Sequence, residues 1–175
     1  DYLPPVVITG AGERFIVAEQ LAQAGIGAEI LLEPERRDSA AAIAVAALHC
    51  AAKDEEEVLL ILAADHLIPD SEAFAAAART ALAATRTGYI MTLGVAPTGP
   101  AVTYGYILKG EPIEGGAGAL RVARFVEKPN ETRAKTLLEE GALWNSGCFM
   151  TRADVMIAEL RSYAPEVVVA TGEAL

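Results

Sequence analysis

The 175-residue chain has the length of one ordinary domain, and 53% of its residues are hydrophobic, which is enough to form a sizeable core. Its formal net charge of −10 at pH 7 argues against a broad nucleic-acid surface, because phosphate binding needs clustered Lys and Arg. No apolar run reaches the length of a membrane span, and the first residues lack a signal-peptide pattern. These features predict a compact, soluble, cytoplasmic protein that binds neither nucleic acid nor membrane.

The beginning of the chain predicts a strand, a turn and a helix. Residues 6–9 form a short apolar run, and a Gly-Ala-Gly turn at 10–12 leads into a helical pattern. A second strand follows and ends in Glu33, so the layout approaches the dinucleotide-binding fingerprint. Phe15 stands where that fingerprint requires its third glycine. A tight turn before a helix is therefore the favoured interpretation, and dinucleotide binding is the alternative.

The next two elements place an acidic residue after a strand. An Ala-rich helix is predicted over residues 40–53, with Asp38 or Ser39 as its N-cap. Residues 58–62 form a continuous apolar run, which is typical of a central strand covered on both faces. Asp65 follows, at the end of the strand where open parallel sheets bind ligands. A carboxylate there suits Mg²⁺, and a turn or helix cap is the alternative role.

The rest of the chain continues the alternation of helices and strands. A helix at 71–86 and a strand at 89–95 complete a pattern that predicts one layered α/β domain over residues 1–175, with a mainly parallel central sheet. Further segments are predicted as strands (104–108, 122–127 and 144–150), a Gly-rich turn (111–119) and helices (132–140 and 153–163). Cys50 and Cys148 have no metal-ligand spacing and are predicted to be reduced thiols.

Polar residues with complementary chemistry stand at the ends of three later strands. Glu127 and Asn145 suit a hydroxyl-rich ligand, because each can hold OH groups in fixed directions. Lys128 supplies a compact positive charge for a phosphate. Gly105, between two tyrosines, allows a close approach of the backbone to a ligand. Each motif is weak alone, but the set in this order is specific.

These motifs resemble those of the sugar-phosphate nucleotidyltransferases, and among them the bacterial mannose-1-phosphate guanylyltransferases. The resemblance covers nearly the whole chain, through residues 14–21, 33–34, 37–40, 64–66, 104–107, 125–129 and 144–149. It implies a Rossmann-like layered fold and the transfer of GMP from GTP to mannose 1-phosphate, which gives GDP-mannose and pyrophosphate with Mg²⁺ as cofactor.

The resemblance also implies a role for each matching residue. Asp65 is expected to bind Mg²⁺ and, with Lys128, to be catalytic. The sugar ring is expected to contact Gly105, Glu127 and Asn145, and its phosphate to contact Lys128. The guanine nucleotide is expected near Arg37, Asp38 and Ser39. The expected partners are GTP and mannose 1-phosphate, and a homodimer stays open.

Several departures from the family pattern leave alternatives open. Asp38, Ala41, Ala63 and Thr103 differ from the usual residues, and a carboxylate at position 38 would repel a triphosphate. The family's first strand and Gly-rich triphosphate loop have no match here. The chain is therefore expected to be a partial catalytic domain of a longer protein, nearly inactive alone. Transfer to another sugar such as glucose 1-phosphate, a non-catalytic nucleotide sensor and a bifunctional isomerase are the alternatives.

Overall fold

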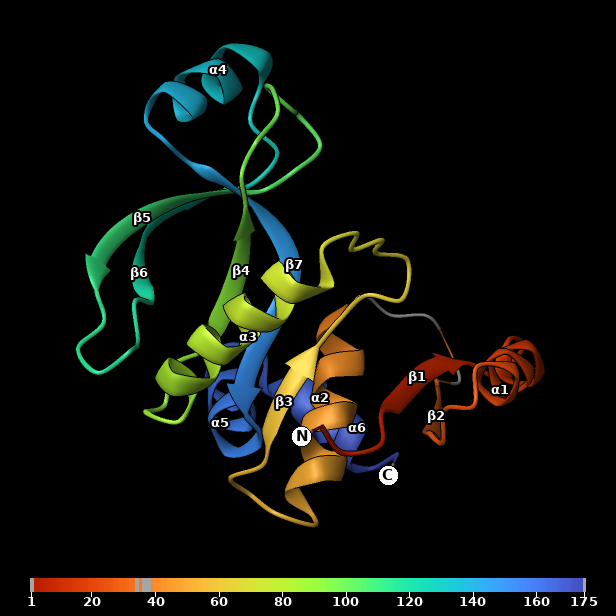
Figure 1. Cartoon of the computed structure of the whole chain (residues 1–175). Coiled ribbons are helices and arrows are strands. Elements are labelled where there is room, and N and C mark those ends of the chain that lie inside the picture. The colour runs from red at the N-terminus through yellow and green to blue at the C-terminus, as the bar shows by residue number, and fades with distance from the viewer. Residues whose placement is uncertain (1, 34, 36–38, 175) are drawn as a thin grey trace. The chain divides into compact units, whose positions relative to one another are not determined.

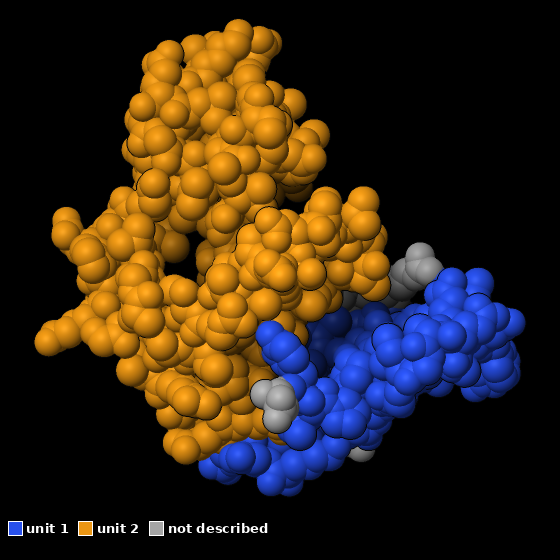
Figure 2. Space-filling view, in the orientation of Figure 1, with its two compact units in different colours: residues 1–55, 156–175 blue, residues 56–155 orange. Residues whose placement is uncertain are grey.

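The computed structural model describes residues 2–33, 35 and 39–174 (Figure 1). Contacts divide the chain into two compact units (Figure 2). The first unit comprises residues 1–55 and 156–175, and the second comprises residues 56–155.

The first unit is built from two strands and four helices of the described chain: β1 (Val6–Gly10), α1 (Arg14–Gln23), β2 (Glu29–Glu33), α2 (Ser39–Ala51), most of α5 (Ala153–Tyr163) and α6 (Pro165–Gly172). Strands β1 and β2 pair in parallel, and α2 packs against α6. Helix α6 was not predicted. The sequence interpretation ended the last helix near Pro165, whereas proline at the first helical position favours the start of a helix.

The second unit holds a five-stranded sheet. Its elements are β3 (Val58–Ile61), α3 (Ser71–Thr85), β4 (Met91–Val95), β5 (Tyr106–Pro112), β6 (Leu120–Val126), α4 (Glu131–Glu139) and β7 (Leu143–Arg152). The strand order is β3-β7-β5-β6, and β4 also pairs with β7. The α/β class and the predicted order of these elements are confirmed.

The expectation of a mainly parallel sheet is only partly shown. The pair β1–β2 is parallel, but every described pair in the five-stranded sheet is antiparallel. Met150 pairs with Leu60 of β3 and with Met91 of β4, so β7 lies between two strands that run in the same direction. Helix α3 joins those two strands as predicted. A strand inserted from much later in the chain cannot be inferred from the local alternation of strands and helices.

The prediction that β3 is a central strand covered on both faces stays a prediction. Within the described residues β3 pairs with β7 alone, and all four of its residues are partly buried. The expectation that a further strand pairs with its outer edge stays a prediction.

Two buried clusters hold the two halves of β7. On one half, Met150 packs against Ala78 and Ala81 of α3, and the buried Thr85 hydroxyl donates to Met150 O at 3.3 Å. On the other half, Trp144 packs on the buried Tyr106 and Leu137. Small alanine side chains let α3 approach the sheet closely. Strand β7 is therefore fixed at both ends, and the residues between those ends are positioned with it.

No helix in the described part of the chain is long and apolar enough to cross a membrane.

An ion-pair cluster braces the segment that joins β6 to α4. The Glu140 carboxylate accepts from Arg124 of β6 at 2.6 Å and from Arg133 of α4 at 2.7 Å. The Arg133 hydrogen bond is the main cause of a lowered pKa of Glu140. Residues 127–130 lie between the two arginines in sequence, so Glu140 ties together both sides of this turn.

We expect Glu140→Gln to lower the thermal unfolding temperature at neutral pH, because it removes the charge that both arginines contact. The pKa of Glu140 is lower in the folded than in the unfolded chain, so its contribution is present at neutral pH and is lost as pH falls through the lowered value. Unfolding temperatures of both proteins from pH 7 to pH 3 should therefore converge in acid. A difference that stays constant with pH would contradict this role.

Candidate functional site

The centre of β7 contains a bulge. Thr92 pairs with Phe149 and Gly94 pairs with Asn145, so one residue of β4 faces three residues of β7, at positions 146–148. Gly147 adopts a left-handed backbone with φ of 74°, which costs glycine little. Bulges of this kind redirect side chains and are frequent beside functional sites.

Hydrogen bonds hold the bulge in shape. Asn145 Oδ1 accepts from the backbone N–H of Gly147 at 3.3 Å, and Ser146 Oγ accepts from the backbone N–H of Cys148 at 3.1 Å. On the β4 side, the Thr92 hydroxyl lies 2.7 Å from Asn145 Oδ1 and 3.2 Å from Cys148 O. The bulge is thus secured from both its own side chains and the neighbouring strand.

Beside the bulge, a short stretch of one edge of β7 has no partner strand among the described residues. Trp144 pairs with Val95 of β4 and with Tyr106 of β5, so β5 and β3 share the edge of β7 opposite β4. Strand β3 pairs with residues 149–152 of β7, and β5 pairs with residues 143–144. No described strand pairs with residues 145–148 on that edge. Segments outside the strands can therefore approach this edge of β7.

Gly105 lies at this unpaired stretch of β7, where it contacts both Asn145 and Glu127. Asn145 N donates to Gly105 O at 2.7 Å. A Cβ atom added to Gly105 would lie 2.7 Å from Glu127 Oε2 and 2.7 Å from Phe125 Cζ. The Glu127 carboxylate therefore lies against the Gly105 backbone, and a side chain at position 105 would displace it.

Lys128 belongs to the same cluster. Its backbone N–H donates to Tyr104 O at 3.2 Å, and its ammonium lies 3.4 Å from Glu127 Oε1 with 67% of the side chain exposed. Lys128 has a φ of 43°, a left-handed conformation that is strained for a residue with a side chain. Observed strain at a charged, exposed residue is typical of functional segments.

The segment with Asp65 contacts the other side of the bulge. His66 Nδ1 lies 3.6 Å from Cys148 Sγ, and a Cβ on Gly147 would lie 3.9 Å from His66 Cε1. Asp65 is exposed and makes no hydrogen bond or ion pair within the part of the chain that the structure describes. Contacts thus link Gly105, Glu127, Lys128 and Asn145, and Asp65 precedes His66, which contacts the bulge.

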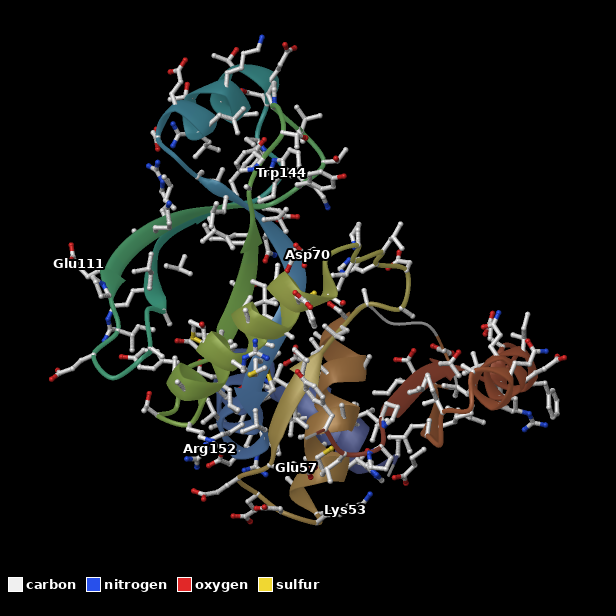
Figure 3. All side chains as sticks on the ribbon, viewed as in Figure 1. Lys53, Glu57, Asp70, Glu111, Trp144 and Arg152 are labelled. Atoms are coloured by element: carbon white, nitrogen blue, oxygen red, sulfur yellow. The ribbon has the colours of Figure 1, made fainter. Side chains whose placement is uncertain are left out.

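Aromatic side chains hold the loop that carries Gly105. The Tyr104 and Trp144 rings meet edge to face with centroids 5.0 Å apart. The buried Tyr106 hydroxyl accepts from Ala101 N at 2.8 Å and donates to Ala101 O at 3.0 Å. Trp144 lies near the base of α4, where β7 begins (Figure 3). These contacts fix the loop before Gly105 on the rigid part of the sheet.

Of the three residues predicted to lie near the guanine nucleotide, the structure describes only Ser39. Arg37 and Asp38 lie outside the described residues, and so does the prediction that Asp38 caps α2. Ser39 is exposed and forms the first residue of α2 in the first unit. The glycines at 10–12 form the turn between β1 and α1, closed by Glu13 N donating to Gly10 O at 3.1 Å.

The donor set available for a metal is a single carboxylate. Within the described residues, no group of three or more His, Cys, Asp or Glu side chains could hold a metal ion. Mg²⁺ commonly takes only one or two protein carboxylates and completes its shell with water and phosphate oxygens. The exposed, unpartnered Asp65 is compatible with such a site.

A comparison with protein-family models gives a match to the family described as nucleotidyl transferase, over residues 2–175. The chain belongs to this nucleotidyl transferase family.

Curated members of the family with similar sequences include three bacterial proteins. Mannose-1-phosphate guanylyltransferase of Escherichia coli K12 is 44% identical over 98% of this chain and 37% of its own length. The protein ManC of Salmonella typhimurium, also named mannose-1-phosphate guanylyltransferase, is 41% identical over 98% and 37%. Xanthan biosynthesis protein XanB of Xanthomonas campestris is 44% identical over 93% and 34%. The chain spans about a third of the length of these relatives.

Solved structures confirm that the nucleotidyl transferase fold is present. One, described as mannose-6-phosphate isomerase from Helicobacter pylori, superposes with a TM-score of 0.83 at 29% identity and covers 97% of this chain and 64% of that protein. Another, described as mannose-1-phosphate geranyltransferase from Thermus thermophilus, gives 0.83 at 32% identity, with 97% and 48% covered.

Thr92 and the contact between His66 and Cys148 are the features of the site that sequence reasoning missed. Thr92 is a polar residue within an otherwise apolar strand, which was the available signal. Its partner Asn145 lies 53 positions away in the chain, and no local pattern predicts that pairing.

We expect Gly105→Ala to move the Glu127 carboxylate away from position 105 while changing the unfolding temperature little. The new Cβ would displace only the ends of two exposed side chains, Glu127 and Phe125. Gly99→Ala is the matched control, because a Cβ there has nothing within 4 Å. A crystal structure of Gly105→Ala in which the Glu127 carboxylate keeps the position it has beside glycine would refute this placement of Glu127.

Proposed function

We propose that the protein containing this chain transfers GMP from GTP to mannose 1-phosphate and releases pyrophosphate. The observation that carries the proposal is the cluster of Gly105, Glu127, Lys128 and Asn145 around the β7 bulge. The names of the relatives at 41% and 44% identity support the choice of mannose 1-phosphate and of a guanylyl group.

The cluster has the donors and acceptors that a sugar phosphate needs. The Glu127 carboxylate accepts hydrogen bonds from hydroxyl groups, and the Asn145 amide donates to them. Lys128 adds a positive charge that is exposed beside Glu127 and suits a phosphate. The absence of a side chain at Gly105 leaves room for the Glu127 carboxylate to lie against the backbone.

The reaction needs no side-chain nucleophile. A phosphate oxygen of mannose 1-phosphate attacks the α-phosphorus of GTP, a new P–O bond forms, and the bond to the pyrophosphate leaving group breaks. The chain's residues contribute by aligning the reactants and neutralising charge. Lys128 holds the attacking phosphate, and Asp65 holds Mg²⁺, which when bound would stabilise charge on the phosphate oxygens.

The proposal is tested by measuring pyrophosphate release from the full-length protein with GTP, mannose 1-phosphate and Mg²⁺. We expect Asp65→Asn to reduce turnover by about a hundredfold or more, since losing metal positioning costs several kcal/mol of transition-state stabilisation. Glu111→Gln, at an exposed hairpin position, is the control and should keep the wild-type rate. Asp65→Asn with a wild-type rate would remove the metal role.

The same assay separates the alternatives. Competition between mannose 1-phosphate and glucose 1-phosphate, and between GTP and other nucleoside triphosphates, identifies the preferred pair. A protein that binds nucleotide yet releases no pyrophosphate with any sugar phosphate would be a non-catalytic sensor, and the proposed transfer would be wrong.

We expect Lys128→Ala to raise KM for the sugar phosphate by about tenfold or more, because hydrogen bonds to charged groups contribute about 1.5–3 kcal/mol. KM for GTP should change much less, since the charge is directed at the other substrate. Lys135→Ala removes an equally exposed lysine of α4, paired only with Glu131 among the described residues, and should leave both constants unchanged. Equal losses for the two substrates would contradict the assignment of Lys128.

A further inference from the structure

Asn145 stands out within the site because its side-chain oxygen already has two donors from the protein. The Thr92 hydroxyl lies 2.7 Å from Asn145 Oδ1, and the Gly147 N–H lies 3.3 Å from the same atom. The Thr92 hydroxyl also lies 3.2 Å from Cys148 O. The Thr92 hydroxyl has one proton and can donate to one of these two oxygens at a time, and the shorter distance favours Asn145 Oδ1.

The Gly147 N–H decides which way the Asn145 amide faces. If the amide were turned over, its NH₂ group would meet the Gly147 N–H, and two donors would oppose each other. With the oxygen held toward Gly147 and Thr92, the NH₂ group points away from them. It makes no hydrogen bond to another group within the described residues, so its two N–H donors stay available.

We propose that Thr92 is a positioning residue that holds the Asn145 side chain so that the site offers a ligand only the NH₂ donors of this amide. This inference rests on the proposed function, and it assigns a specificity role to a residue that touches no substrate. Asn145 then donates to a hydroxyl oxygen, while Glu127 accepts from a hydroxyl group. Together they favour a ligand whose ring carries one hydroxyl that accepts from Asn145 and another that donates to Glu127.

Asn145 and Glu127 meet the same glycine, which makes this pairing geometrically sound. Asn145 N donates to Gly105 O, and the Glu127 carboxylate lies against the position of a Gly105 Cβ. Asn145, through its backbone, and Glu127, through its carboxylate, therefore adjoin the same backbone position. Thr92 sets the donor half of this pair from the adjacent strand β4.

The direct test is Thr92→Val, which keeps the branched shape and removes the hydroxyl. Asn145 Oδ1 then keeps only the long Gly147 contact, so one weak hydrogen bond instead of two holds the amide. We expect the Kd of mannose 1-phosphate, measured by calorimetry on the full-length protein, to rise by about fivefold, the effect of one neutral hydrogen bond. Thr92→Ser restores the hydroxyl and should bind within about twofold of wild type.

Thr85→Val is the matched control. Thr85 also donates its hydroxyl to a β7 carbonyl, that of Met150, and is fully buried, but it does not contact Asn145. It should bind mannose 1-phosphate as the wild type does, even where it lowers the unfolding temperature. A loss of affinity in Thr85→Val as large as that in Thr92→Val would show a general structural effect and overturn the inference.

Deoxy analogues of mannose 1-phosphate supply a readout that a merely structural role would not move. In the wild type, we expect the analogue that lacks the hydroxyl bound by Asn145 to bind several-fold more weakly than the parent. In Thr92→Val this difference should shrink, because the amide that presents the donors is held less firmly. Equal weakening of parent and analogues in Thr92→Val would overturn the inference.

A ligand-free measurement separates this inference from the proposed function. The chain contains two asparagines, Asn130 and Asn145, and Asn130 caps α4 through Arg133 N at 2.9 Å. With asparagine-selective ¹⁵N labelling and assignment by Asn145→Ala, the Asn145 NH₂ signals should shift in Thr92→Val, and those of Asn130 should not. A wild type that binds no sugar phosphate would refute the proposed function alone. Unchanged Asn145 signals in Thr92→Val would refute the inference.

Discussion

The site depends on one constraint, the bulge that residues 146–148 introduce into the central strand β7. A regular strand would place Asn145 and Cys148 in continuous pairing with β4, with the side chains alternating between the two faces of the sheet. The bulge instead keeps Asn145 beside Gly105 and places Cys148 beside His66. Residues from the end of β3, the start of β5 and the end of β6 thus gather around one interrupted stretch of β7.

The bulge can be rigid because β7 is held firmly on both sides of it. Met150 is packed under α3, and Trp144 is packed on the cluster that α4 and β5 form. The two extra residues of β7 cannot be absorbed by sliding the strand, since a shift of register would move both clusters. Packing at the two ends therefore determines the backbone geometry between them.

The sequence predicted local structure well and long-range pairing poorly. Apolar runs and helix caps located the strands and helices from β1 to α5, and Asp70 does cap α3 by accepting from Ala73 N at 2.9 Å. The position of β7 between β3 and β4 was missed, because it depends on contacts between segments about 50 to 90 residues apart. For the same reason the sheet was predicted to be mainly parallel, whereas β3 and β4 both pair antiparallel with β7.

The same distinction between local features and long-range contacts holds for the candidate site. Polar residues at strand ends could be found from the sequence, since strand ends and residue chemistry are local properties. The hydrogen bond between Thr92 and Asn145 depends on how many residues of β7 face one residue of β4, and this number is set by the bulge. Asparagine alone offers a ligand either a donor or an acceptor, depending on its rotation. The Thr92 hydroxyl of the neighbouring strand β4 favours one rotation of the Asn145 amide. A residue remote in sequence therefore helps to determine which groups Asn145 can bind.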